Sequence, residues 1–469
     1  MKKQPAYKGY FFSRGYKDVF NIIKKAWRGV IFPFISEFER LGELFSANFF
    51  IAIINVICDL AVFPIFTILL FSLNLLFSAS FLVFVFVVGI FVYLGYSILY
   101  LTDLLFRVVK GIVSQCPLCQ QKVRLPSYLC PTCKAKHTSL RPSVYGILKR
   151  KCTCGTKLPT TFFNGRQKLQ SVCPYCDHNL KDGGRHVEIL IPVVGGASAG
   201  KTCFITSAMM AIEKHAVANN LQYKYSPTST DNFVRDKTAM EHGITPEKTG
   251  ETRLNYYQFY LTPNGEKIKN LISLCDIAGE AYNDTSEISK QIGYKFANAF
   301  ILVVDPFSII KYKKEQGIGF NATQYKTSEF RLDDVLSSLI TVLENMHCLN
   351  SKNMIKTDVV VVFNKCDYAD LYNRLGAPAI KNYLARHNAT EYQAQNVLCE
   401  NFLIEYEESN FLNTIKSKFK SVQFFACSSL GHIENGRAFS PKGVAEPMLW
   451  IIDKVSKSID LKKKWGKKI

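Results

Sequence analysis

The chain has 469 residues, more than one compact domain usually contains, so two or three structural units are expected. Hydrophobic residues make up 48% of the sequence and charged residues 20%, which excludes an intrinsically disordered chain. The net charge is +20, and residues 107–185 alone carry +13 of it. Such a local excess differs from the charge pattern of a uniformly basic nucleic-acid binder.

Residues 1–46 are predicted to form a basic amphipathic segment. Apolar residues recur at helical spacing between Val19 and Val30, and lysines and arginines occupy the remaining faces. Two interpretations stay open at this stage. The helix lies on an anionic membrane surface, or it packs against the soluble part of the chain.

Residues 47–106 contain only two charges, Asp59 and Asp103. A run of this length accommodates two membrane helices of roughly 20 residues each, so a transmembrane hairpin is predicted. We place the helices near residues 49–71 and 81–101, joined by the uncharged stretch 72–80. Lys and Arg flank the run on both sides, which predicts a multi-pass protein of the inner (cell) membrane with both termini and the C-terminal domain in the cytoplasm.

Residues 107–185 contain four close pairs of cysteines in a chain without a secretory signal, a spacing typical of zinc knuckles rather than disulfides. Four thiolates leave no open position on a zinc ion, so two structural zinc sites are predicted. Pairing between neighbouring knuckles is the simplest arrangement, although an exchange of knuckles between the sites stays open. The module resembles a pair of zinc ribbons, and its charge favours lipid over nucleic acid as the partner. The predicted zinc ligands are Cys116, Cys119, Cys130, Cys133, Cys152, Cys154, Cys173 and Cys176.

Residues 186–469 alternate strand-like apolar runs with helical stretches, which predicts an α/β domain with a parallel sheet. After the strand 186–194 comes GGASAGKT, a glycine-rich loop that can curl its N–H groups around phosphates at a helix N-terminus. In this pattern Lys201 reaches the β and γ phosphates and Thr202 ligates Mg²⁺. The predicted phosphate-binding residues are Gly195, Ala199, Gly200, Lys201, Thr202 and Cys203.

Three further motifs follow apolar strands in the same domain. Asp276-Ile-Ala-Gly places a carboxylate where it can hold Mg²⁺ and an N–H where it can meet a γ-phosphate. The sequence NKCD, with Asn364, Lys365 and Asp367, supplies a carboxylate suited to the two donors of guanine. Ser428 and Ser429 lie in a final loop, CSSLG.

These four motifs in this order resemble those of P-loop GTPases of the Ras-like and translation-factor class. The resemblance implies GTP or GDP with Mg²⁺, and two switch loops that respond to the γ-phosphate. It assigns guanine binding to Asn364, Lys365, Asp367, Ser428 and Ser429, and Mg²⁺ binding to Thr202, Thr249 and Asp276. The catalytic set that it implies is Lys201, Thr249, Gly279 and Glu280.

Two positions in the switch loops leave alternatives open. Thr252 is the second choice for the first-switch threonine, and Arg253 is a possible internal arginine finger. Glu280 stands where Ras-like proteins carry a water-positioning glutamine. Hydrolysis is therefore possible, but its rate stays open.

The layout of membrane segment, zinc ribbons and GTPase also resembles the bacterial double-GTPase proteins of conflict and signalling systems. The function predicted is a slow, membrane-anchored GTPase switch whose partners are the bilayer and unidentified proteins that bind the switch loops. The insertions at 311–333 and 371–413 are candidate partner surfaces. One alternative is a membrane effector or scaffold latched by GTP, which Asp59 and Pro64 inside the span suggest. The other is a zinc-ribbon nucleic-acid binder.

Overall fold

The computed structural model describes residues 4–44, 49–116, 118–180, 186–226, 230–246, 255–266, 268–276, 292–317, 327–431 and 439–456. The chain divides into two compact units. The N-terminal unit contains residues 1–111 and 125–184, and the C-terminal unit contains residues 112–124 and 185–469.

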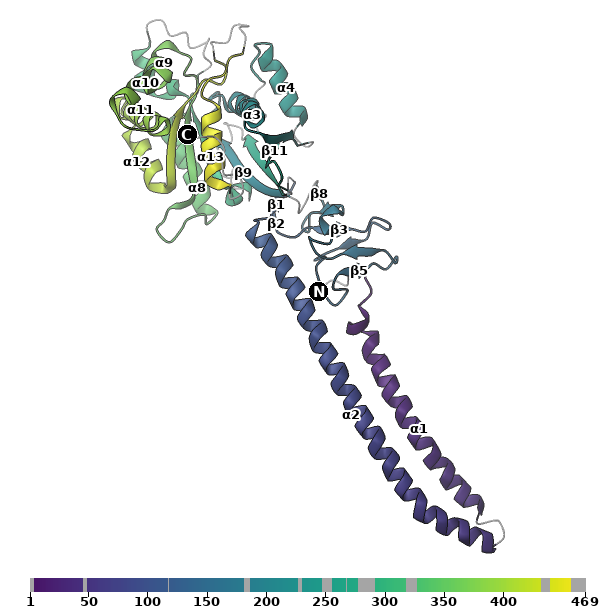
Figure 1. The fold of residues 1–469 in the computed structure, drawn as a ribbon. Helices are drawn as coiled ribbons and strands as arrows, with labels where there is room; N and C mark the ends of the chain where they lie inside the picture. Colours follow the sequence, from purple (N-terminus) through teal and green to yellow (C-terminus); the bar gives the residue numbers. More distant parts are fainter. Residues whose placement is uncertain are drawn as a thin grey trace. The chain divides into compact units, whose positions relative to one another are not determined.

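Two long helices dominate the N-terminal unit. Helix α1 (Arg14–Leu44) and helix α2 (Phe49–Val109) lie side by side in Figure 1. The predicted break at residues 72–80 is wrong, because α2 is one continuous helix of 61 residues. That stretch, SLNLLFSAS, contains neither Gly nor Pro, the two residues that break helices most strongly, and its apolar residues favour the helix.

Helix α2 is also the membrane-span candidate among the described residues. Its segment Val62–Val109 is long and apolar enough to cross a bilayer, and only 6% of its most apolar window is buried. A core helix of a soluble protein would bury most of that surface. Pro64 lies inside α2, whereas the side chain of Asp59 is outside the described set.

Asp103, which the sequence shows only as a charge in an apolar run, fixes the end of α2 to the cysteine module. Its carboxylate is 1% exposed and pairs with Arg166 at 3.0 Å and with Arg107 at 3.3 Å. The backbone N–H of Phe162 also donates to it at 2.8 Å. Because a buried carboxylate is tolerated only when it is paired and hydrogen-bonded, this network orders the junction.

The cysteine module is built from short strands. A four-stranded sheet has the order β4-β3-β7-β8, and a separate hairpin joins β5 to β6. Antiparallel pairing at every step places the knuckle turns at the strand ends. The bounds are β3 Ser127–Leu129, β4 Lys136–His137, β5 Lys149–Lys151, β6 Lys157–Pro159, η2 Arg166–Lys168, β7 Ser171–Val172 and β8 Asn179–Leu180.

The C-terminal unit contains a seven-stranded sheet of order β10-β11-β12-β9-β13-β14-β15. Strands β12, β9, β13, β14 and β15 are parallel, as predicted, whereas β10 and β11 form an antiparallel edge. The predicted hairpin between β11 and β12 is confirmed. The bounds are β9 His186–Val194, β10 Leu221–Tyr225, β11 Asn255–Pro263, β12 Lys269–Asp276, β13 Ala299–Val304, β14 Ile355–Phe363 and β15 Phe419–Ala426.

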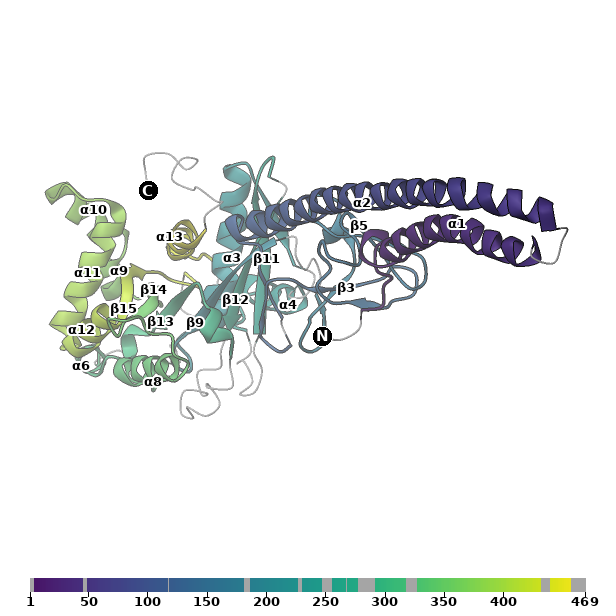
Figure 2. The same ribbon diagram turned by 90° about the horizontal axis from the view of Figure 1, so that it is seen from below.

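Helices cover both faces of this sheet, as Figure 2 shows. One apolar core lies under α8, α9, α11 and α12, and the other lies under α3, α4 and α13. Val359 to Val362 are fully buried between the two, which explains why this strand is a continuous apolar run. The helix bounds are α3 Lys201–Ala218, α4 Thr230–Glu241, α6 Ile310–Glu315, α8 Leu332–Asn345, α9 Ala369–Leu375, α10 Ala377–Arg386, α11 Glu391–Glu405, α12 Ser409–Lys418 and α13 Ala445–Val455. Helices α9 to α12 occupy the second predicted insertion.

A small hairpin that precedes the sheet in sequence belongs to the C-terminal unit. Its strands are β1 (Ser114–Gln115) and β2 (Lys122–Val123), and it is attached to β9 through a parallel bridge between Val113 and Val187. The backbone N–H of Gln115 donates to the Glu188 carboxylate, which also accepts from the Ser273 hydroxyl at 2.9 Å. Burial raises the pKa of Glu188 to about 7.

This raised pKa predicts that stability falls as pH rises. Between about pH 4.5 and 7 the folded state retains a proton on Glu188 that the unfolded state has released, so each increase in pH favours unfolding. Glu188→Gln should remove this part of the pH dependence and make the protein more stable than wild type at pH 8. Thermal unfolding of both proteins from pH 5 to pH 8 gives the slope of melting temperature against pH for each. Equal slopes in wild type and Glu188→Gln would contradict the raised pKa of Glu188.

Candidate nucleotide-binding site

The glycine-rich loop lies at the carboxyl end of β9, where the sequence placed it. Ser198 and Gly200 both have left-handed backbones, with φ of 60° and 86°. A Cβ on Gly195 would collide with the carbonyl of Val303, and a Cβ on Gly200 would collide with the amide of Asn364. Only glycine fits either position, so the curl of the loop depends on both.

Lys201 begins helix α3 and points back into the loop. The residue is 7% exposed, and its ammonium donates to the carbonyls of Gly195 and Gly196, both at 3.0 Å. An ammonium beside a glycine-rich loop at a helix N-terminus is suited to phosphate. The residues predicted to bind phosphate thus lie together in the loop and in the first turn of α3, which also contains Cys203.

Thr202 and Asp276 lie together, although they are 74 residues apart in sequence. The Thr202 hydroxyl donates to a carboxylate oxygen of Asp276 at 2.6 Å, and Asp276 is fully buried at the end of β12. A hydroxyl and a carboxylate oxygen are the ligand types that Mg²⁺ takes beside nucleotide phosphates. The donor set therefore fits the predicted metal.

The two base-binding loops are joined to each other and to the P-loop. Asn364 donates to the carbonyl of Ala199 at 3.1 Å and accepts from the Ser429 hydroxyl at 2.9 Å. The Ser428 hydroxyl donates to Asp367 at 2.8 Å. All five residues predicted to bind guanine therefore lie at the same edge of the sheet as the P-loop, since Lys365 donates to Ser198 in that loop.

The remaining candidates fall outside the described residues. They are Thr249, its alternative Thr252, Arg253, Gly279 and Glu280. Their assignment as switch residues remains a prediction.

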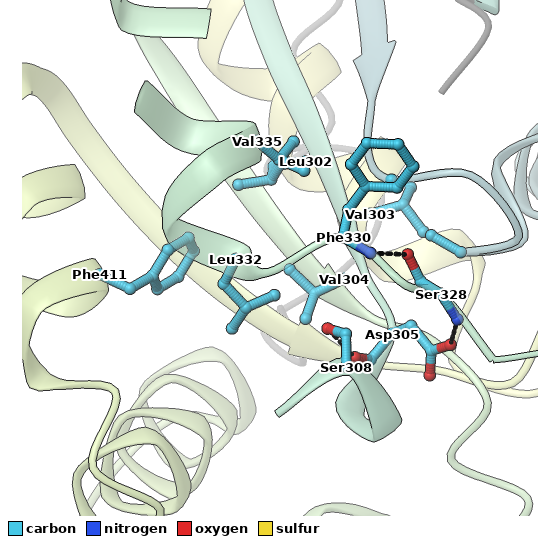
Figure 3. Close-up of a pocket in the computed structure, with 12 residues that line it drawn as sticks. Leu302, Val303, Val304, Asp305, Ser308, Ser328, Phe330, Leu332, Val335 and Phe411 are labelled. Carbon is cyan, nitrogen blue, oxygen red and sulfur yellow. Dashed lines mark hydrogen bonds between the residues drawn. The ribbon is translucent and has the colours of Figure 1, made fainter. Parts of the chain in front are cut away.

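Sequence reasoning missed Asp305 and Ser328. Asp305 follows β13, and its buried carboxylate accepts from Lys365 at 2.7 Å and from the backbone N–H of Ser328 at 2.8 Å. Figure 3 shows both residues beside a cavity that also contacts Gly196 of the P-loop. The position of Asp305 at the end of a buried strand was a usable signal, because ligand sites of open α/β sheets gather at the carboxyl edge.

Four of the eight predicted zinc ligands converge within the N-terminal unit. The sulfur atoms of Cys130, Cys133, Cys152 and Cys154 all lie within 4.8 Å of one another. The Cys130–Cys154 and Cys133–Cys152 sulfur separations are 3.6 Å and 3.5 Å, close to the roughly 3.8 Å edge of a tetrahedron with Zn–S bonds of about 2.3 Å. This set can hold zinc.

The cluster corrects the simplest pairing drawn from the sequence. It combines the second knuckle with the third, whereas neighbouring knuckles were expected to pair as first with second and third with fourth. The β5–β6 hairpin brings Cys152 and Cys154 to the turn after β3, which explains the exchange. The other two knuckles, residues 116–119 and 173–176, each supply two thiols and remain the candidates for the second zinc ion.

Comparison with known proteins identifies the domain. The family model "Double-GTPase 2" matches residues 189–407. No curated protein matches the chain. One matching solved structure is the Roco2 RocCORdC of Methanosarcina barkeri bound to GDP, with 13% sequence identity and a TM-score of 0.23. The match covers 57% of this chain and about half of that one, 50%. Because residues 189–407 match this family model and contain the P-loop, they are a GTP-binding domain of the Double-GTPase 2 family.

Proposed function

We propose that this protein is a membrane-anchored GTP-binding switch that hydrolyses GTP slowly at the cytoplasmic face of a bacterial inner membrane. The observation that carries the proposal is the meeting of three motifs at one sheet edge. Lys201, the Thr202–Asp276 pair and the loop with Asp367 lie where a nucleotide's phosphates, metal and base are needed. The conflict or signalling setting rests on the resemblance in domain layout alone.

Each group of residues has a distinct role in this proposal. When a nucleotide binds, the Lys201 ammonium exchanges the carbonyls of Gly195 and Gly196 for phosphate oxygens. Its positive charge then neutralises part of the phosphate charge. Thr202 and Asp276 would hold Mg²⁺, which would neutralise phosphate charge. Thr249 and Gly279 make the γ-phosphate dependent contacts of the switch loops, and Glu280 orients the attacking water.

The membrane part of the proposal rests on α2. The segment Val62–Val109 is 48 residues long, or about 72 Å at 1.5 Å per residue, more than twice a hydrocarbon core of about 30 Å. Its C-terminal part packs on the cysteine module through Tyr100, Asp103 and Phe106, and the charged residues of that junction would be costly to place in hydrocarbon. We therefore place the spanning part before Tyr93, where tyrosines begin to mark an interface.

Guanine selectivity is the property that tests the nucleotide site. We expect full-length protein in nanodiscs to bind fluorescent GDP and GTP at least a hundredfold more tightly than ATP. Asp367→Asn should lose most of that preference, because an amide offers donors where guanine also presents donors. The matched control is Asp370→Asn, three residues further along the chain. The Asp370 carboxylate accepts hydrogen bonds from Tyr312 and Arg374.

Phosphate release is measured separately from binding. Selective binding with slow release supports the switch that we propose. Selective binding without any release favours a GTP-latched scaffold, and equal affinity for GTP and ATP in wild type would contradict the proposal.

A further inference from the structure

Asp305 holds two distant segments on one buried carboxylate. The side chain has no exposed surface and accepts from the backbone N–H of Phe307 at 3.0 Å. Its other oxygen accepts from Lys365 at 2.7 Å and from the backbone N–H of Ser328 at 2.8 Å. The base-binding loop and the segment before α8 are therefore tied to the same atom.

Lys365 depends on this tie for its position. The residue has a left-handed backbone, with φ of 61°, which costs a non-glycine residue free energy unless its contacts compensate. Its ammonium bridges Asp305 and the carbonyl of Ser198, and Ser198 is itself left-handed. Asp305 thus sets the position of a lysine that spans the base-binding loop and the P-loop.

The segment Thr327–Arg331 also contacts the P-loop directly. A Cβ on Gly196 would lie 2.5 Å from the Ser328 hydroxyl and 3.0 Å from the Phe330 Cβ. Figure 3 shows Ser328 and Phe330 above the strand end that carries Asp305, around the cavity that Gly196 also lines. Any movement of the P-loop at Gly196 must therefore move this segment or open a gap beneath it.

We propose that Asp305 is a positioning residue for guanine-nucleotide binding, and that it links Lys365 to the segment Thr327–Arg331, which thereby responds to nucleotide occupancy. The inference rests on the nucleotide binding proposed above. It adds an occupancy-sensing segment that is distinct from the two switch loops. The segment leads directly into α8, so the response reaches the helical face of the domain.

The test measures two quantities on the full-length protein in nanodiscs. The first is the release rate of fluorescent GDP, and the second is hydrogen–deuterium exchange of the peptide that contains residues 327–331. In wild type, GDP should slow exchange in that peptide. Asp305→Asn should accelerate release by roughly ten- to a hundredfold, because it removes a charge-assisted hydrogen bond from Lys365, and it should abolish the GDP-dependent protection.

Asp358→Asn is the matched control. Asp358 is also buried, accepts from the Ser421 hydroxyl at 2.7 Å and pairs with Lys420 at 3.5 Å, but it lies near the amino end of β14, away from the nucleotide edge. Loss of that carboxylate should lower the melting temperature and leave the GDP release rate and the protection of residues 327–331 unchanged.

Lys365→Met tests the same link without altering Asp305 or the segment. It should also remove the GDP-dependent protection, and the double variant Asp305→Asn/Lys365→Met should release GDP no faster than Lys365→Met alone. A purely structural role for Asp305 would instead give additive losses. If Asp305→Asn does not fold, the exchange of Lys365→Met at a GDP concentration that saturates it decides the question, and protection retained there overturns the link.

Two outcomes are distinguishable. If wild type binds no guanine nucleotide, the proposed function fails and the positioning role fails with it. If wild type binds GDP while Asp305→Asn behaves like Asp358→Asn, or while residues 327–331 exchange equally with and without GDP, this inference alone is overturned.

Discussion

Lys201→Ala should weaken binding of both GTP and GDP by about a hundredfold to ten-thousandfold. Lys201 is 7% exposed, and its ammonium donates to two carbonyls inside the loop, so it can supply two charge-assisted contacts to phosphate, each worth roughly 1.5–3 kcal/mol. No other side chain in the described part of the P-loop, residues 195–202, is cationic. Isothermal titration with each nucleotide in the presence of Mg²⁺ measures the loss.

The same helix provides a control for this prediction. Lys214 is exposed on α3, between three and four turns from the loop at about 3.6 residues per turn, and Lys214→Ala should bind both nucleotides as wild type does. Lys201→Ala should also keep a melting temperature close to wild type without nucleotide, but it should not be stabilised by added GDP. Retained stabilisation by GDP in Lys201→Ala would show that the P-loop is not the binding site.

The sequence predicted those parts of the site that lie within one short motif. The P-loop, the Asp276 motif and the NKCD loop each combine a strand end with residues a few positions apart, so periodicity and motif spacing locate them together. The role of Asp305 was not predicted, because its partners, Ser328 and Lys365, are 23 and 60 residues away in sequence. Such a contact depends on which strands become neighbours, which a motif does not state.

The errors in the fold have a similar origin. A break in α2 was expected from the usual length of a membrane span, but residues 72–80 contain neither Gly nor Pro, and the helix continues through them. The strand β10 was missed because its five residues, LQYKY, add an edge to the sheet with only partial burial. The role of Asp103 could not be predicted, because its partner Arg166 lies 63 residues later, inside the cysteine module.

Cysteine pairing gives the second prediction with a large expected effect. Cys152→Ser should lose the zinc ion of the Cys130–Cys154 cluster and unfold the β5–β6 hairpin around it. Cys152 is fully buried and packs in a small core with Tyr128 and Leu158, which without metal is too small to be stable. Structural zinc contributes apparent free energies of about 10–16 kcal/mol in zinc-finger peptides, so little of the local fold should persist. Zinc content by mass spectrometry and proteolysis of the module measure the two effects.

The double variant Cys130→Ser/Cys152→Ser distinguishes the observed pairing from the sequential one. If both residues ligate the same ion, as their sulfur positions require, the double variant loses one zinc per chain, as either single variant does. Sequential pairing of knuckles would place Cys130 and Cys152 on different ions, and the double variant would then lose two. Cys348→Ser, at a partly buried single cysteine in the C-terminal unit, should keep the full zinc content. Since serine is a poor zinc ligand, the count of ions lost reports the connectivity directly.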